Sequence, residues 1–161
     1  MKYQNLKLFE KSLTSHIGCR VFLIQMSSDQ ERSAILQKIV QGALPQTHSL
    51  ERFTSDVECR EVFDALLSPS LFGGEAVVIL DECEAFKKKE LEKLSEFLEN
   101  GLLSGYLLLS SRGKTPLSKV VDKIGVVFDM TEEKPWDRDK RLSETLSEMA
   151  KNCLLYTSRC V

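Results

Sequence analysis

The amino-acid sequence predicts an α/β domain built on a mostly parallel sheet, and three observations support this fold class. First, short apolar runs alternate with segments of helical periodicity, giving three successive strand–helix alternations. Second, the strongest strand segment, "EAVVILD" at 75–81, is continuously apolar and β-branched, as expected for a strand covered on both faces. Third, the pattern becomes purely helical after residue 130. Right-handed crossovers should join the parallel strands.

The first half of the chain contains two strand–helix units. The run "RVFLIQM" predicts a strand over 20–26, and the next segment predicts a helix that Ser28 or Asp29 can cap. The apolar face of that helix comprises Ala34, Ile35, Ile39 and Val40. A short strand is expected over 48–55 and a helix over 55–67. The apolar residues of this second helix are Val57, Phe63, Leu66 and Leu67.

The second half continues the alternation after the strand at 75–81. A helix is expected over 84–101, where Asn100-Gly101 forms a natural C-terminal stop. One side of that helix carries Leu91, Leu94 and Leu98. The run "YLLLSS" predicts a buried strand over 106–111, "TPLSKVVDKIG" a short helix, and "GVVFDM" a last strand over 125–130.

The remaining residues predict a helix that leaves the α/β domain. Thr131 can cap it, Pro135 suits its first turn, and its apolar face comprises Leu142, Leu146 and Met149. The final stretch, "CLLYTSRCV", lacks this periodicity, and we expect it not to be a native continuation. The expected organisation is therefore an α/β domain over 1–130, a helix entering a truncated lid domain over 131–152, and a non-native tail over 153–161.

Composition limits the classes of function. The chain has 161 residues, 42% of them hydrophobic and 29% charged, which is typical of a soluble globular protein with one ordinary domain. The formal net charge of -2 gives no overall electrostatic reason to bind nucleic acid or an anionic membrane. Five cysteines occur without a C-x-x-C pair or zinc-ligand spacing, so we expect reduced thiols, a cytoplasmic location and no metal.

The sequence argues against a nucleotide-hydrolysing enzyme, because it lacks a phosphate-binding loop. The strand at 75–81 ends in Asp81-Glu82, as the magnesium-binding strand of an ATPase does. The G-x-x-x-x-G-K-[ST] loop should fall at 25–33, but "QMSSDQERS" has no glycine and no lysine, and it carries Asp29 and Glu31. We therefore interpret Asp81 and Glu82 as a degenerate Walker-B-like pair whose side chains cap the next helix. The alternative is an active hydrolase or kinase with an atypical loop near Ser27-Ser28 and magnesium at Asp81.

Other catalytic patterns are absent from the sequence. It contains neither a G-x-S-x-G nucleophile elbow nor an H-E-x-x-H metal motif. We interpret His16 and His48 as surface or structural histidines, Cys83 as a packing residue and the lysines at 87–89 as a solvated surface. The sequence thus predicts no catalytic residue and no cofactor site.

One loop is unusually apolar. Leu71 and Phe72 stand between Pro69 and Gly73-Gly74, where a loop should be polar. In a partner's pocket, each side chain would contribute on the order of 2 kcal/mol. The alternative is that both side chains fold back onto the domain's own core.

The order of these features resembles the N-terminal domain of delta subunits of the bacterial DNA polymerase III clamp loader, an AAA+-like family. The resemblance covers roughly residues 1–150, from a first strand without a phosphate loop to "EEKPWDRDKRL". It includes "LLSPSLFGGEAVVILDECEAFKKK", "LLLSSRGK" and "LSKVVDKIG", and it is most specific at "SPSLFGGEAVVILD" and "EKPW".

The resemblance implies a three-layer AAA+/RecA-like domain that does not hydrolyse nucleotide. Such domains bind the sliding clamp (the beta subunit) through an adjacent Leu-Phe pair, here Leu71-Phe72, and hold one clamp interface open. It implies further partners in the other clamp-loader subunits, DNA only through the complex, and a share in the DNA-directed DNA polymerase activity of the holoenzyme. A lid domain and a C-terminal helical domain would follow residue 150. An adaptor domain with a different protein partner is a third possibility.

Overall fold

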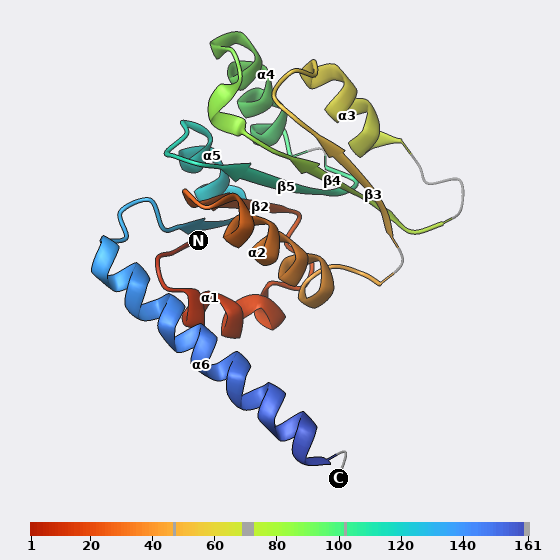
Figure 1. Cartoon of the computed structure of the whole chain (residues 1–161). Coiled ribbons are helices and arrows are strands. Elements are labelled where there is room, and N and C mark those ends of the chain that lie inside the picture. Colours follow the sequence, from red (N-terminus) through yellow and green to blue (C-terminus); the bar gives the residue numbers. More distant parts are fainter. Residues whose placement is uncertain (47, 69–72, 102, 160–161) are drawn as a thin grey trace. The chain divides into compact units, whose positions relative to one another are not determined.

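The computed structural model describes residues 1–46, 48–68, 73–101 and 103–159, and it divides into two compact units, Met1–Thr131 and Glu132–Val161. In the first unit, the described residues form a six-stranded sheet in the order β1-β6-β2-β5-β4-β3, with every pairing parallel (Figure 1). The strands are β1 (Lys2–Tyr3), β2 (Val21–Gln25), β3 (His48–Phe53), β4 (Glu75–Leu80), β5 (Tyr106–Ser111) and β6 (Val126–Asp129). The predicted α/β fold class is confirmed.

Helices cover both faces of the sheet and make three layers (Figure 1). One face packs against α1 (Leu6–Ser12), the 3₁₀ helix η1 (Leu13–His16) and α2 (Asp29–Gly42). The other face packs against α3 (Cys59–Leu67), the 3₁₀ helix η2 (Cys83–Ala85), α4 (Lys88–Glu99) and α5 (Leu117–Ile124).

Strand β2 shows why the strand segments of the sequence are continuously apolar. Phe22 and Ile24 pack in the core beneath α1 and α2, whereas Val21 and Leu23 pack beneath α3, α4 and α5. Successive side chains point to opposite faces of a strand, and here both faces are buried. All five residues of β2 are therefore inaccessible to solvent.

The predicted strands and helices are present, and the differences lie in the details. The prediction of the buried face of α2 was wrong in part, because Ala34 is exposed while Leu36 and Arg32 are buried. On α3, Leu67 is exposed and Val62 is buried. The helix expected over 84–101 begins as η2 and becomes α-helical only at Lys88. The sequence patterns also gave no indication of β1, which is only two residues long.

The second unit contains one helix, α6 (Pro135–Arg159). Glu133 and Arg141 form a two-pronged ion pair with N–O distances of 2.7 and 2.8 Å, which ties the entry segment to the helix. The predicted cap was wrong, because Thr131 donates its hydroxyl and its amide to Asp129 instead, while the carbonyl of Lys134 accepts the first helical bonds. The helix runs on past residue 152, although the non-native origin of 153–161 stays a prediction. In the described part of the chain, no helix combines the length and the apolar character that a membrane crossing requires.

Candidate functional site

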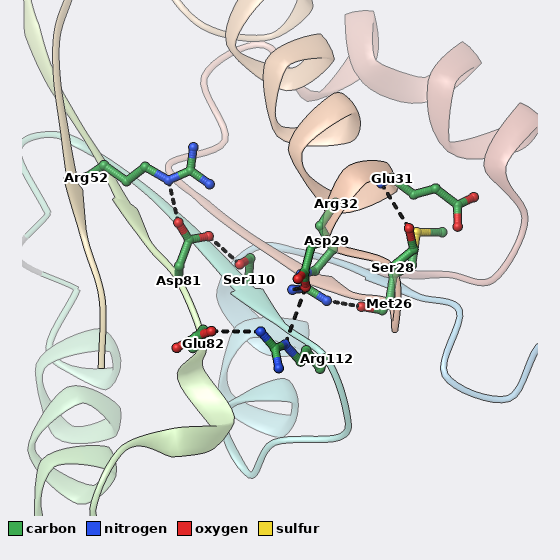
Figure 2. Close-up of polar contacts among 10 residues, drawn as sticks. All are labelled: Met26, Ser28, Asp29, Glu31, Arg32, Arg52, Asp81, Glu82, Ser110 and Arg112. Atoms are coloured by element: carbon green, nitrogen blue, oxygen red, sulfur yellow. Dashed lines mark hydrogen bonds and ion pairs between the residues drawn. The ribbon is translucent and has the colours of Figure 1, made fainter. Parts of the chain in front are cut away.

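Charged side chains gather where β2, β4 and β5 end, at the carboxyl edge of the sheet (Figure 2). In open α/β sheets this edge is where ligands bind, because successive loops converge there. It is also where a phosphate loop and a magnesium-binding carboxylate would lie. The geometry of this edge therefore tests whether the chain can handle a nucleotide.

The connection from β2 to α2 is too short for a phosphate loop. Only Met26–Ser28 separate the end of the strand from the first residue of the helix, Asp29. The hydroxyl of Ser28 accepts a hydrogen bond of 3.3 Å from the amide of Glu31, which confirms the predicted cap. Asp29 and Glu31 both lie in the first turn, where helix N-termini stabilise negative charge. The helix terminus thus carries carboxylates of its own.

Arg32 completes this junction. Its side chain is buried, donates to the carbonyl oxygen of Met26 and pairs with the carboxylate of Asp29 (Figure 2). A buried guanidinium requires such partners, because an unpaired buried charge is strongly unfavourable. Sequence reasoning missed Arg32. The available signal was its position on the buried face of α2, three residues before Ile35.

Asp81 lies at the end of β4 with both carboxylate oxygens engaged. One oxygen pairs with the guanidinium of Arg52 from β3, and the other accepts a 2.6 Å hydrogen bond from the hydroxyl of Ser110 on β5 (Figure 2). These contacts join three neighbouring strands at one carboxylate. A magnesium ion at Asp81 would compete with these contacts for the carboxylate.

Arg112 connects the end of β4 to the start of α2. Its Nη2 lies 2.9 Å from a carboxylate oxygen of Glu82, and its Nε lies 3.3 Å from a carboxylate oxygen of Asp29 (Figure 2). Glu82 adopts a left-handed backbone conformation with φ of 55°, which is unfavourable for a residue with a side chain. In this conformation the side chain of Glu82 forms its ion pair with Arg112.

The interpretation of Asp81 and Glu82 as residues that cap the next helix holds only for the position of Glu82, which is the N-cap residue of η2. Neither η2 nor α4 has a side-chain hydrogen bond at its N-cap. Both carboxylates are turned to arginines from other elements instead. We refer to Asp29, Glu82 and Arg112 as the Arg112 bridge.

The carboxyl edge is therefore neutralised by the chain's own side chains. Each of the three carboxylates, Asp29, Asp81 and Glu82, contacts at least one arginine. Within the described ranges, no group of three His, Cys, Asp or Glu side chains could hold a metal ion. A bound phosphate would require glycine amides and a lysine at this edge. The edge carries paired charges instead.

The other residues singled out from the sequence have structural surroundings. His16 Nε2 lies 2.8 Å from the hydroxyl of Tyr3, and burial lowers the pKa of this histidine. Cys83 is fully buried in the core, and burial raises the pKa of its thiol far above the usual range. The lysines at 87–89 are exposed, as predicted. The side chain of His48 lies outside the described residues.

Leu71 and Phe72 also lie outside the described residues, together with Pro69. The structure describes the two ends of their loop. At one end, the amide of Ser68 donates to the carbonyl of Asp64 and closes α3. At the other end, Gly73 and Gly74 have φ angles of 76° and 94°, a region that glycine adopts readily.

No protein-family model matches the sequence, and no curated protein matches it significantly. Solved structures do match. The Bacillus subtilis DNA clamp loader delta protein aligns with a TM-score of 0.59 and 16% identity over 74% of this chain and 40% of its own. The Thermotoga maritima RuvB Holliday junction branch migration motor aligns with a TM-score of 0.54 and 15% identity, over 78% of this chain and 45% of its own.

A DNA polymerase III gamma subunit-related protein from Thermotoga maritima also aligns, with a TM-score of 0.52 and 15% identity over 85% of this chain and 48% of its own. This chain therefore spans less than half the length of each of these three proteins. At such low identity the matches show the fold alone. The α/β fold is similar to those of the clamp loader delta protein, of RuvB and of the gamma subunit-related protein.

Proposed function

We propose that the chain is the clamp-binding domain of a bacterial clamp-loader delta subunit, which binds the sliding clamp and holds it open without hydrolysing nucleotide. The observation that carries the proposal is an AAA+-like fold in which Asp29, paired with Arg112, lies at the position of the phosphate loop. The similarity to a clamp-loader delta structure agrees with this proposal.

The carboxyl edge weakens the case for an active hydrolase or kinase. A nucleotide phosphate near Ser28 would face the carboxylates of Asp29 and Glu31 in the first turn of α2. No lysine replaces them in the connection to that helix. We expect that calorimetric titration with Mg-ATP detects no binding at millimolar nucleotide. Micromolar binding that disappears in Asp81→Asn would instead establish the alternative function.

The proposed mechanism is differential binding. A domain that binds the open clamp more tightly than the closed clamp shifts the ring toward the open form. Leu71 and Phe72 supply the apolar contacts, ATP is hydrolysed by sister subunits, and DNA enters through the opened ring. The other clamp-loader subunits would be contacted by domains that follow the described α/β unit in a full-length delta subunit.

The test is a calorimetric titration of the chain with a bacterial beta clamp. The double variant Leu71→Ala/Phe72→Ala should lose about 4 kcal/mol of binding free energy, or roughly a thousandfold in affinity. Its thermal unfolding should stay close to that of the unmodified chain. Leu8→Ala is the matched control, because Leu8 is 61% exposed on α1 and its truncation should leave affinity unchanged. Equal clamp affinity in the double variant would refute the assignment of the site.

A further inference from the structure

A second set of contacts, distinct from the Arg112 bridge, connects the two ends of the loop between α3 and β4, and we call it the Arg20 bridge. The hydroxyl of Ser104 donates to the carbonyl of Leu66 in the last turn of α3, at 2.7 Å. The carbonyl of Ser104 accepts from Arg20 Nη1 at 2.8 Å, and Arg20 Nη2 donates to the carboxylate of Glu75 at 2.9 Å. Glu75 is the first residue of β4. The bridge therefore runs without a gap from the end of α3 to the start of β4.

Neighbouring groups hold Arg20 in place. Its guanidinium lies 5.1 Å from the ring centroid of Tyr106, a favourable cation–π position. The hydrogen bond from Arg20 lowers the pKa of Glu75, so this carboxylate is ionised at neutral pH. A Cβ on Gly105 would lie 2.5 Å from the carbonyl oxygen of Ala76, which shows how closely the backbone beside Ser104 approaches β4.

The bridge is poorly suited to a role in global stability. The side chains of Arg20 and Glu75 are 38% and 36% exposed, and neither belongs to the two core clusters. Ion pairs this exposed contribute little to the free energy of unfolding. The hydroxyl of Ser104 satisfies a carbonyl at the end of α3, where helices lack internal partners. What the bridge does connect are the two ends of the loop.

We propose that Arg20 is a positioning residue that fixes the base of this loop for partner binding. The inference rests on the proposed function, because the loop contains Leu71 and Phe72. A loop with fixed ends has fewer conformations to lose when its side chains enter a pocket, so affinity is higher. Arginine suits this role because its planar guanidinium donates in two fixed directions at once, to Ser104 and to Glu75.

The experiment measures two quantities for each variant of the chain. These are its affinity for a bacterial beta clamp by calorimetry and hydrogen exchange in peptides covering residues 66–75. Arg20→Ala and Ser104→Ala should each exchange faster in these peptides and bind the clamp roughly 3- to 10-fold more weakly. Arg20→Lys should recover little of this affinity, because an ammonium group keeps the charge but not the two-way geometry. Arg60→Ala is the control, since Arg60 is a solvent-exposed arginine on α3.

Each outcome decides something different. Faster exchange with unchanged clamp affinity would overturn the positioning role of Arg20, and so would full recovery in Arg20→Lys. Unchanged exchange in both alanine variants would show that the bridge does not hold the loop. If the unmodified chain does not bind the clamp, the proposed function fails and the binding role of Arg20 fails with it. Exchange would still decide whether the bridge fixes the loop.

Discussion

Substitution of Arg112 by alanine tests whether paired charges stabilise the carboxyl edge in place of a bound nucleotide. Arg112 is 54% exposed, and its partners Asp29 and Glu82 are 66% and 40% exposed. Ion pairs of this exposure contribute about 0.2–1 kcal/mol each. With two such pairs lost, Arg112→Ala should reduce the free energy of unfolding by about 1 kcal/mol. For a domain of this size, that corresponds to a fall of about 4 °C in melting temperature.

The assay is thermal unfolding followed by circular dichroism at low and high salt. At 1 M salt the Debye length falls to about 3 Å, so the difference between the two proteins should shrink. In Glu82→Gln, the additional change Arg112→Ala should have a smaller effect, because one of its two partners is already neutral. Lys88→Ala is the control, since Lys88 is highly exposed and lies 4.0 Å from Glu92. A loss that is equally large at 1 M salt would refute the electrostatic explanation.

Two further predictions concern stability. The carboxylate of Glu90 accepts hydrogen bonds from Lys93 and from the amide of Cys59, which lower its pKa to about 2. Since the folded pKa lies below the unfolded value, this stabilisation should be present above about pH 4.5 and be lost toward pH 2. Urea titrations at each pH should show that the free energy of unfolding falls less steeply toward pH 2 in Glu90→Gln than in the unmodified chain. An equally steep fall in both proteins would contradict the assignment. A Cβ on Gly125 would lie 2.3 Å from a carbonyl oxygen of β2, so Gly125→Ala should lower stability by about 1–3 kcal/mol in urea unfolding. Gly113→Ala, whose Cβ would meet open space, should not, and equal effects would disprove the steric reason.

Much of the fold was predictable because its strands are covered on both faces. The residues of β5 (Tyr106–Ser111) are all buried, and the predicted range matches the observed one. By contrast, β1 pairs through Lys2 and Tyr3 only, and two residues carry no periodic signal. On α2, helical spacing allowed either Ala34 or Leu36 to face the sheet. The structure places the larger side chain in the core.

At the carboxyl edge of the sheet, only the absence of a phosphate loop could be predicted from the sequence. The absence of glycine and lysine from 25–33 is visible in the sequence, and the structure shows why the segment still folds, through the cap by Ser28. The Arg112 bridge was not predictable, because it joins Glu82 and Asp29, which are far apart in the chain. Ion pairs between distant residues leave no pattern of spacing. The role of Leu71 and Phe72 stays a prediction.

The sheet order also has a consequence for synthesis of the chain. Strand β1 pairs with β6, with Lys2 opposite Val127, and β2 lies between β6 and β5. A ribosome adding about 5–20 residues per second needs roughly 6–25 s to make the segment that separates the two pairing partners. Strand β2, one of the most apolar stretches of the protein, has neither neighbour available from the synthesis of Gln25 until that of β5, which begins at Tyr106. The nascent domain must therefore emerge with its central strand unpaired, which makes it a candidate for protection by a chaperone until β5 has been made.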